Sequence, residues 1–218
     1  MKKLGFVVFM LAMALMLGGN ALAQTAGDNS VYFVTYYSNA NTAGSAPSLK
    51  QVATTLAPDA VVRVINDGDQ ATTAVEGVEN GPLWAAFYIF DDSEELQSCC
   101  ACLVTSDGLV SESVNKQLTS NEFTGRAEIT RGVIKVVSSS SSDPTNPVVS
   151  PGLRVWGTHI QATTNVPEKG PWFVTETTFA DSNLGKVELG NLGLSCSFGL
   201  TLGSGYGLCP CTPEDHDF

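Results

Sequence analysis

The stretch LWAAFYIF, from Leu83 to Phe90, is apolar or aromatic throughout and shows no alternation of polar and apolar positions. It lies between Gly81-Pro82 and Asp91-Asp92, residue pairs that are typical of turns. A run this short between turn residues predicts a strand that is buried on both faces at the centre of the fold, and a buried helix is the competing interpretation.

Further segments on both sides of this run combine β-branched and aromatic residues and are separated by turn signals. The sequence Asn66-Asp67-Gly68-Asp69 predicts a tight hairpin turn, since Asp-Gly tolerates positive φ. The expected strands are 31–37, 60–65, 70–78, 83–90, 127–131, 133–137, 153–160, 172–179, 195–202 and 206–211. This spacing favours an all-β fold with minor helix, an antiparallel β-sandwich or jelly roll.

A few segments do not fit the strand pattern. Residues 93–99 follow Asp92 and carry Glu95, which predicts a short capped helix. Residues 182–192 predict a short helical turn, and residues 110–118 are ambiguous between helix and strand. Gly132 is expected to form a bulge between two strands. Residues 138–151 are rich in Ser and Pro and predict an exposed loop inside a single domain of residues 24–218, with a linker between two subdomains as the alternative.

The N-terminus has the pattern of a secretory signal peptide. Met1-Lys2-Lys3 is followed by an uncharged apolar run from residue 4 to residue 17 and by Ala21-Leu22-Ala23, so we expect cleavage after Ala23. As a helix this run would be about 21 Å long, short of the roughly 30 Å of a bilayer core. We therefore expect a protein that is secreted, in the periplasm or at the cell surface, with no integral membrane segment after cleavage.

The cleaved chain would be strongly acidic. It would have nine Lys or Arg against twenty-two Asp or Glu, a formal charge of −13. An acidic surface repels phosphate backbones, so we expect no nucleic-acid partner.

Six cysteines fall into two groups. An even number of cysteines in an exported chain predicts disulfides. We expect the bridges to join the two groups, because a bridge across about a hundred residues lowers the entropy of the unfolded chain. In the simple loop model this stabilises the folded state by about 4–5 kcal/mol. Six such pairings are open. A thiolate metal site and a redox pair at the Cys-x-x-Cys spacing of residues 99 and 102 are the alternatives. The cysteines are Cys99, Cys100, Cys102, Cys196, Cys209 and Cys211.

The block from Asp91 to Cys102, Asp-Asp-x-x-Glu-x-x-x-Cys-Cys-x-Cys, together with Cys209-x-Cys211, resembles a pattern in an uncharacterised group of exported bacterial proteins. The resemblance covers two short segments. The resemblance implies a bacterial envelope or secreted origin and implies no function.

No catalytic motif is complete in the chain, and we expect a non-enzymatic protein. His159 lies in a predicted strand and His216 in a charged tail, and neither belongs to a metal-binding or catalytic pattern. The segment Gly193-Leu-Ser195-Cys-Ser197 lacks the final glycine of a nucleophile elbow. An exported hydrolase that uses His159 and strand acids such as Glu176 is the remaining enzymatic alternative.

We expect no cofactor, but two acidic stretches could hold calcium. Calcium prefers several oxygen ligands, and neither stretch completes a ligand set; a hairpin turn and a helix cap are the competing interpretations. The candidate residues are Asp67, Asp69, Asp91, Asp92, Glu94 and Glu95.

Two further features suggest a role. An aromatic-rich strand close to the new N-terminus could be donated to the sheet of another copy, although pairing within its own sheet is the alternative. Its residues are Val31, Tyr32, Phe33, Val34, Tyr36 and Tyr37. Trp156 and Trp172 could stack on a glycan, or they could pack in the core. We therefore expect a structural, adhesive or surface-assembly subunit, or alternatively a carbohydrate-binding module.

Overall fold

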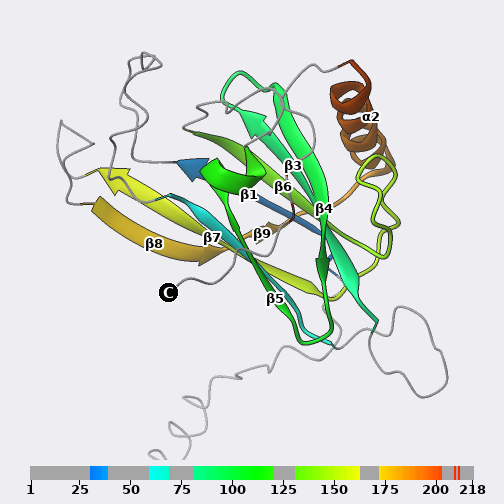
Figure 1. Ribbon diagram of the computed structural model, residues 1–218, viewed down its shortest axis with the longest axis horizontal. Coiled ribbons are helices and arrows are strands. Elements are labelled where there is room, and N and C mark those ends of the chain that lie inside the picture. The colour runs from blue at the N-terminus through cyan, green and yellow to red at the C-terminus, as the bar shows by residue number, and fades with distance from the viewer. Residues whose placement is uncertain are drawn as a thin grey trace, which may run out of the picture.

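The computed structural model describes residues 30–38, 59–68, 81–119, 131–162, 172–202, 209 and 211. Two antiparallel sheets pack face to face, and a helix lies on the outside of one of them (Figure 1). The larger sheet has the strand order β4 (Leu96–Val104), β3 (Leu83–Asp91), β6 (Arg131–Ser139), β1 (Tyr32–Ser38) and β9 (Ala180–Asp181). The smaller sheet has the order β5 (Leu109–Ser113), β2 (Val61–Asn66), β7 (Leu153–Ala162) and β8 (Trp172–Thr178). The predicted all-β sandwich is confirmed.

Strand β3 is buried on both faces, as its unbroken apolar run predicts. Ala85, Phe87 and Ile89 face the core between the two sheets, whereas Ala86 and Tyr88 face a second cluster on the outside of the larger sheet. Successive side chains of a strand point to opposite faces, so only a sheet that is covered on both sides favours a run without polar positions.

The cover on the outer side is helix α2 (Lys186–Leu202) together with the loop that follows β6. Leu192 and Cys196 of the helix pack in the same cluster as Tyr88 and Val137 of the sheet. The Tyr88 hydroxyl also donates a hydrogen bond of 2.7 Å to the carbonyl of Pro144. The larger sheet is therefore the middle layer of the molecule.

The loop after β6 is less exposed than the Ser/Pro composition predicts. Ser138 and Ser139 are the last residues of β6 and are fully buried, so the prediction of an exposed loop from residue 138 is wrong at its start. Pro144 and Pro147 are also buried. A serine run can end a central strand because its hydroxyls bond to nearby backbone: the Ser139 hydroxyl accepts from the amides of Ser141 and Val148.

The predicted helix at 93–99 is wrong, because the chain makes a turn there and continues as β4. The Asp91 carboxylate accepts hydrogen bonds from the amides of Ser93 and Glu95, and Glu94 has a left-handed φ of 67°. An acidic residue that accepts from nearby amides serves a hairpin turn as well as a helix start, which is why the local pattern is misleading.

Four other predictions of secondary structure are corrected or completed. Residues 195–202 belong to helix α2 and are not a strand, and the short helical turn predicted at 182–192 is the beginning of this longer helix. Gly132 is not a bulge, because it pairs in register with Tyr37 and Asp91. The ambiguous stretch 110–118 is both strand and helix, since β5 leads into a π-helical turn, η2 (Val114–Leu118).

Strand β1 pairs inside its own sheet, the alternative that the sequence left open. All seven of its residues pair with β6, and Phe33 and Val34 also pair with β9. Phe33 and Tyr37 are buried in the core. The strand predicted at 70–78, most of the one at 206–211 and nearly all of the one at 127–131 lie outside the described residues, as does the signal segment. Among the helices of the described segments, none is long and apolar enough to cross a membrane.

Candidate functional site

Strand β4 directs its three cysteines to two different layers. Neighbouring positions of a strand face opposite ways and alternate positions face the same way. Cys99 therefore points outward to α2, where it bridges Cys196 with a Cα–Cα distance of 5.8 Å. Cys100 and Cys102 point into the core, where they bridge Cys209 and Cys211, with Cα–Cα distances of 5.3 Å and 5.2 Å. All bridges join the two groups, as predicted, and the structure selects one of the six open pairings.

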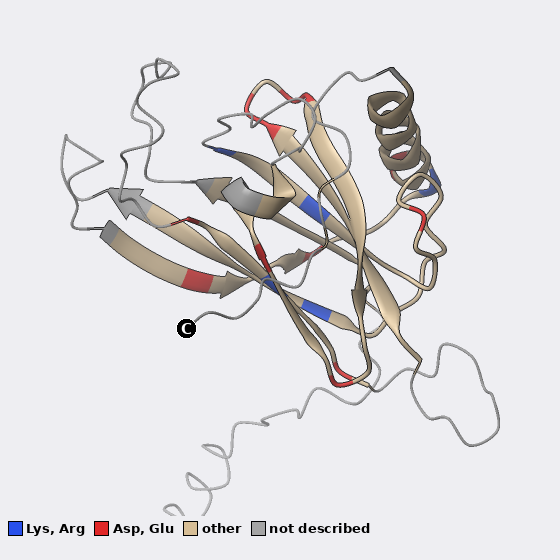
Figure 2. Cartoon of the chain, viewed as in Figure 1, with Lys and Arg blue, Asp and Glu red and all other residues tan. Residues whose placement is uncertain are grey.

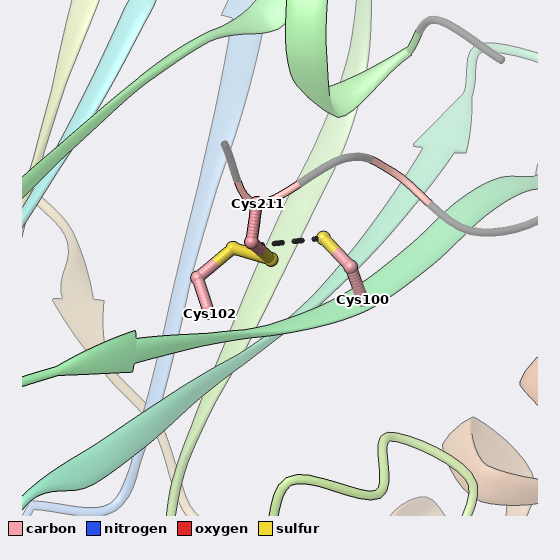
Figure 3. A group of neighbouring side chains, drawn as sticks. All are labelled: Cys100, Cys102 and Cys211. Atoms are coloured by element: carbon pink, nitrogen blue, oxygen red, sulfur yellow. Dashed lines mark hydrogen bonds between the residues drawn. A yellow bond between two sulfur atoms is a disulfide. The ribbon is translucent and has the colours of Figure 1, made fainter. Parts of the chain in front are cut away.

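The two inner bridges lie side by side, which brings three sulfur atoms together. The sulfurs of Cys100, Cys102 and Cys211 lie within 4.8 Å of one another, and those of Cys100 and Cys102 are 3.9 Å apart (Figure 3). All six cysteines are in disulfides, and a metal needs thiolates. Cys99 and Cys102 face opposite sides of β4, which is unlike the helix N-terminus on which a Cys-x-x-Cys redox pair sits. This geometry favours a structural role for the sulfurs.

The acidic candidates for calcium already have partners or lie apart. Asp67 pairs with Arg154 at 3.1 Å, and Asp92 pairs with Arg131 at 2.7 Å. Asp91 organises the β3–β4 turn and also accepts from Gln97 Nε2 at 2.6 Å. Glu94 and Glu95 are exposed at the tip of that turn, and Asp69 is outside the described residues. The two stretches lie on different sheets, and calcium stays a prediction.

His159 of β7 is buried, only 5 % exposed, and contacts side chains of β8 and β1. Its Nε2 is 2.9 Å from the Thr177 hydroxyl, and its ring packs on Tyr36 with centroids 4.4 Å apart. Burial lowers the pKa of His159 below its usual value. Glu176, the strand acid considered with it, instead pairs with Arg63 at 2.5 Å. The hydroxyl in contact with His159 is therefore that of Thr177, and the hydrolase stays a prediction. His216 lies outside the described residues.

The structure does not bring the two candidate tryptophans together. Trp156 of β7 pairs with Thr178 at the end of β8, and Trp172 lies six residues earlier, at the beginning of β8. Six residues of strand span about 20 Å. The two positions share a face of the sheet but are too far apart to stack on one sugar ring, so glycan binding stays a prediction.

Strand β8 is exposed in a way that the sequence did not predict. It forms one edge of the smaller sheet within the described residues, and β5 forms the other. Residues 173–178 are all exposed, on both faces, including Phe173 at 67 % and Val174 at 54 %. In Figure 1, β7 and β8 extend away from the larger sheet. An exposed edge strand of this kind is a template for pairing with another strand.

Helix α2 is the second exposed apolar feature. Val187, Leu194 and Phe198 are 77 %, 57 % and 52 % exposed. Sequence reasoning found only the beginning of this helix, the short helical turn at 182–192, because the Ser and Gly residues of its second half resemble a strand with turns. The available signal was the spacing of Leu189, Leu192 and Cys196, which is helical and marks the buried side.

No protein-family model matches the chain, and comparisons with curated proteins and with solved structures find no match. The functional argument therefore depends on the two exposed surfaces alone.

Proposed function

We propose that the protein is an exported, non-enzymatic subunit of a surface assembly, structural or adhesive, and that copies join through the outer edge of β8. The exposed strand β8 carries this proposal. A soluble monomer usually protects such an edge with charge, proline or a covering segment. Residues 172–178 contain no proline and no lysine.

The chemistry of the edge suits a second copy as the partner. Glu176 is the one charged residue of β8, and its carboxylate is engaged by Arg63 of the same chain. An antiparallel pair of β8 strands centred on Thr175 would place Val174 opposite Glu176, so the two acids would not face each other. Backbone hydrogen bonds would supply the attraction, as in other strand-addition contacts.

The proposal moves the assembly contact away from β1. Because β1 contributes Phe33 and Tyr37 to the core, removing residues 24–38 would unfold the subunit instead of merely preventing its assembly. The outer edge of β8 can be altered without touching that core.

A matched pair of lysine substitutions tests the edge. Val174→Lys places a charge on β8, and Val148→Lys places the same charge at a position of equal exposure, 55 %, in the loop after β6. We expect Val174→Lys to weaken self-association at least tenfold by sedimentation velocity, and Val148→Lys to leave it unchanged. A wild-type protein that stays monomeric at all concentrations, or equal effects of the two substitutions, would contradict the proposal.

Export is part of the same proposal and has its own test. The three disulfides support an oxidising compartment, secreted, periplasmic or at the cell surface. We expect the mature protein to begin at Gln24, which N-terminal sequencing of secreted material checks. An intact Met1 on secreted protein would contradict cleavage after Ala23.

A further inference from the structure

We infer that the outward face of α2 binds the same face of a second copy as an antiparallel, two-fold helix pair. The inference rests on the proposed role as an assembly subunit, but it concerns a contact that is separate from the edge of β8. It names a second interface and its partner.

The inward side of α2 is fixed by three attachments to its own chain. Cys196 is bridged to Cys99 of β4. Glu188 accepts hydrogen bonds from the Tyr32 hydroxyl at 2.8 Å and from Lys135 Nζ at 2.7 Å. The helix therefore cannot rotate to bury its other side, and the outward face remains exposed.

The outward face has the spacing of a helix–helix contact. Its residues follow one another at intervals of four, three, four and three, which keeps them on one stripe of an α-helix. Such alternation is the pattern by which one helix packs against another, with side chains of each entering the gaps of its partner. The stripe consists of Val187, Asn191, Leu194, Phe198 and Thr201.

The absence of charge along most of α2 permits a second copy as the partner. The chain is acidic, with a formal charge of −11, yet residues 189–202 contain no Asp, Glu, Lys or Arg. In Figure 2 the helix is tan except at its N-terminal end, where Lys186 and Glu188 lie. Two acidic molecules repel each other, but at an uncharged stripe they can come into contact without placing like charges against each other. An anionic membrane would be repelled by the rest of the molecule.

Gly190 on this face has no explanation among the described residues of the monomer. Glycine inside a helix costs about 1 kcal/mol relative to alanine, and a Cβ at position 190 would meet no atom of the described residues within 4 Å. Gly193, in contrast, lies against the carbonyl of Thr145 and has an internal reason to be glycine. Small residues on a helix face allow the backbone of another helix to approach closely, which assigns Gly190 to the contact.

The helix dipoles and the position of Lys186 favour an antiparallel orientation of the pair, with which the stripe is compatible. Leu194 is at its midpoint, seven residues from Val187 and seven from Thr201, so a two-fold axis at Leu194 brings the whole stripe of each copy into contact. The antiparallel arrangement separates the two Lys186 side chains and aligns the helix dipoles favourably. One helix pair is a small contact, and we expect a dissociation constant in the micromolar range or weaker.

A charge placed at the axis tests the contact. Leu194→Glu would place two carboxylates against each other, whereas Leu200→Glu makes the same change about 120° away from the centre of the stripe around the helix. We expect Leu194→Glu to weaken helix-mediated dimerisation at least tenfold by sedimentation equilibrium, and Leu200→Glu to change it less than twofold. Thermal unfolding of both variants checks that they remain folded. Equal effects on dimerisation would overturn the inference.

Engineered cysteines test the orientation. In the antiparallel pair two Leu194→Cys residues meet at the axis, while two Val187→Cys residues lie about 21 Å apart along the helices, beyond the reach of a disulfide. We expect a covalent dimer of Leu194→Cys only. Crosslinking at both positions would show a parallel pair, and crosslinking at neither would show no pair; both results overturn the inference.

Combining the substitutions separates the two interfaces. In the Val174→Lys background the remaining dimer should disappear on addition of Leu194→Glu. If Val174→Lys has no effect but Leu194→Glu does, the contact at β8 fails and the helix contact stands. If Leu194→Glu has no effect in either background, the helix contact fails, whatever the result at β8.

Discussion

At position 132, a side chain of any size would collide with the backbone of the neighbouring strand, since a Cβ there would overlap the carbonyl of Phe90. We expect Gly132→Ala to lower the free energy of unfolding by about 1–3 kcal/mol, because the strands would have to separate locally. Gly190→Ala provides the contrast: we expect it to raise the monomer's stability by up to about 1 kcal/mol. Urea unfolding of dilute, oxidised protein measures both, and shifts of the same sign would contradict this explanation.

His159 should make stability depend on pH. Because burial holds its pKa below the usual 6.5, the folded chain keeps the ring neutral while the unfolded chain takes up a proton. Stability is therefore greatest above pH 6.5, and falls as the pH decreases from 6.5 towards the lower pKa of the folded state. We expect His159→Gln to reduce the loss of stability between pH 7 and pH 5 in urea unfolding. An unchanged pH profile would contradict this.

The Glu188 carboxylate acts in a separate range of pH. The hydrogen bond from Lys135 is the main cause of its lowered pKa, so its contribution is lost only as the pH falls below the usual 4.5. The two effects can therefore be distinguished in one pH series.

At the scale of elements, the sequence predicts those whose signals are local and unmixed. Strands β1, β2, β3, β7 and β8 are dense in β-branched and aromatic residues, and all five were predicted. Strand β4 was missed because Asp91 and Asp92 resemble a helix start. Only the beginning of helix α2 was predicted, because residues 189–202 are neither charged nor strongly amphipathic, and packing against the larger sheet is what makes them helical.

The disulfide framework was predictable in outline but not in detail. An exported chain with six cysteines predicts disulfides, and the larger stabilisation from bridges that close long loops predicts that they join the two groups. Choosing among six pairings requires knowing that residues 99–102 form a strand, because only then does Cys99 face away from Cys100 and Cys102. The exposed edges were not predictable, since exposure depends on which faces the other elements leave uncovered.

Removing the outer bridge should loosen α2 selectively. In a Cys99→Ala/Cys196→Ala double variant, we expect faster hydrogen exchange in residues 186–202 and unchanged exchange in β3 and β6. The loop model gives about 4–5 kcal/mol for closing about a hundred residues, an upper value here because the inner bridges already restrict the same segments. The control is Cys102→Ala/Cys211→Ala, which should leave exchange in α2 unchanged. A uniform increase in exchange would show that α2 does not respond as a separate unit.

For the molecule as a whole, the three bridges should differ in their resistance to reduction. Cys211 is the one cysteine that is partly exposed, and the other five are buried. Access of the attacking thiol limits the rate of exchange, so we expect the Cys102–Cys211 bridge to open first under mild reductant. Timed alkylation and mass spectrometry would identify the order. Simultaneous loss of all three bridges would instead indicate that reduction requires global unfolding.

Every bridge joins β4 to a residue at position 196 or later, and this has a consequence for how the protein is made. The ribosome completes β4 long before it reaches the partner cysteines, so the three thiols of β4 cannot form their native disulfides until the last part of the chain has been made. A product that ends before Cys196 has three cysteines, and because three is odd, at least one thiol cannot be paired within it. Incomplete chains would therefore carry a reactive sulfur that the finished protein lacks.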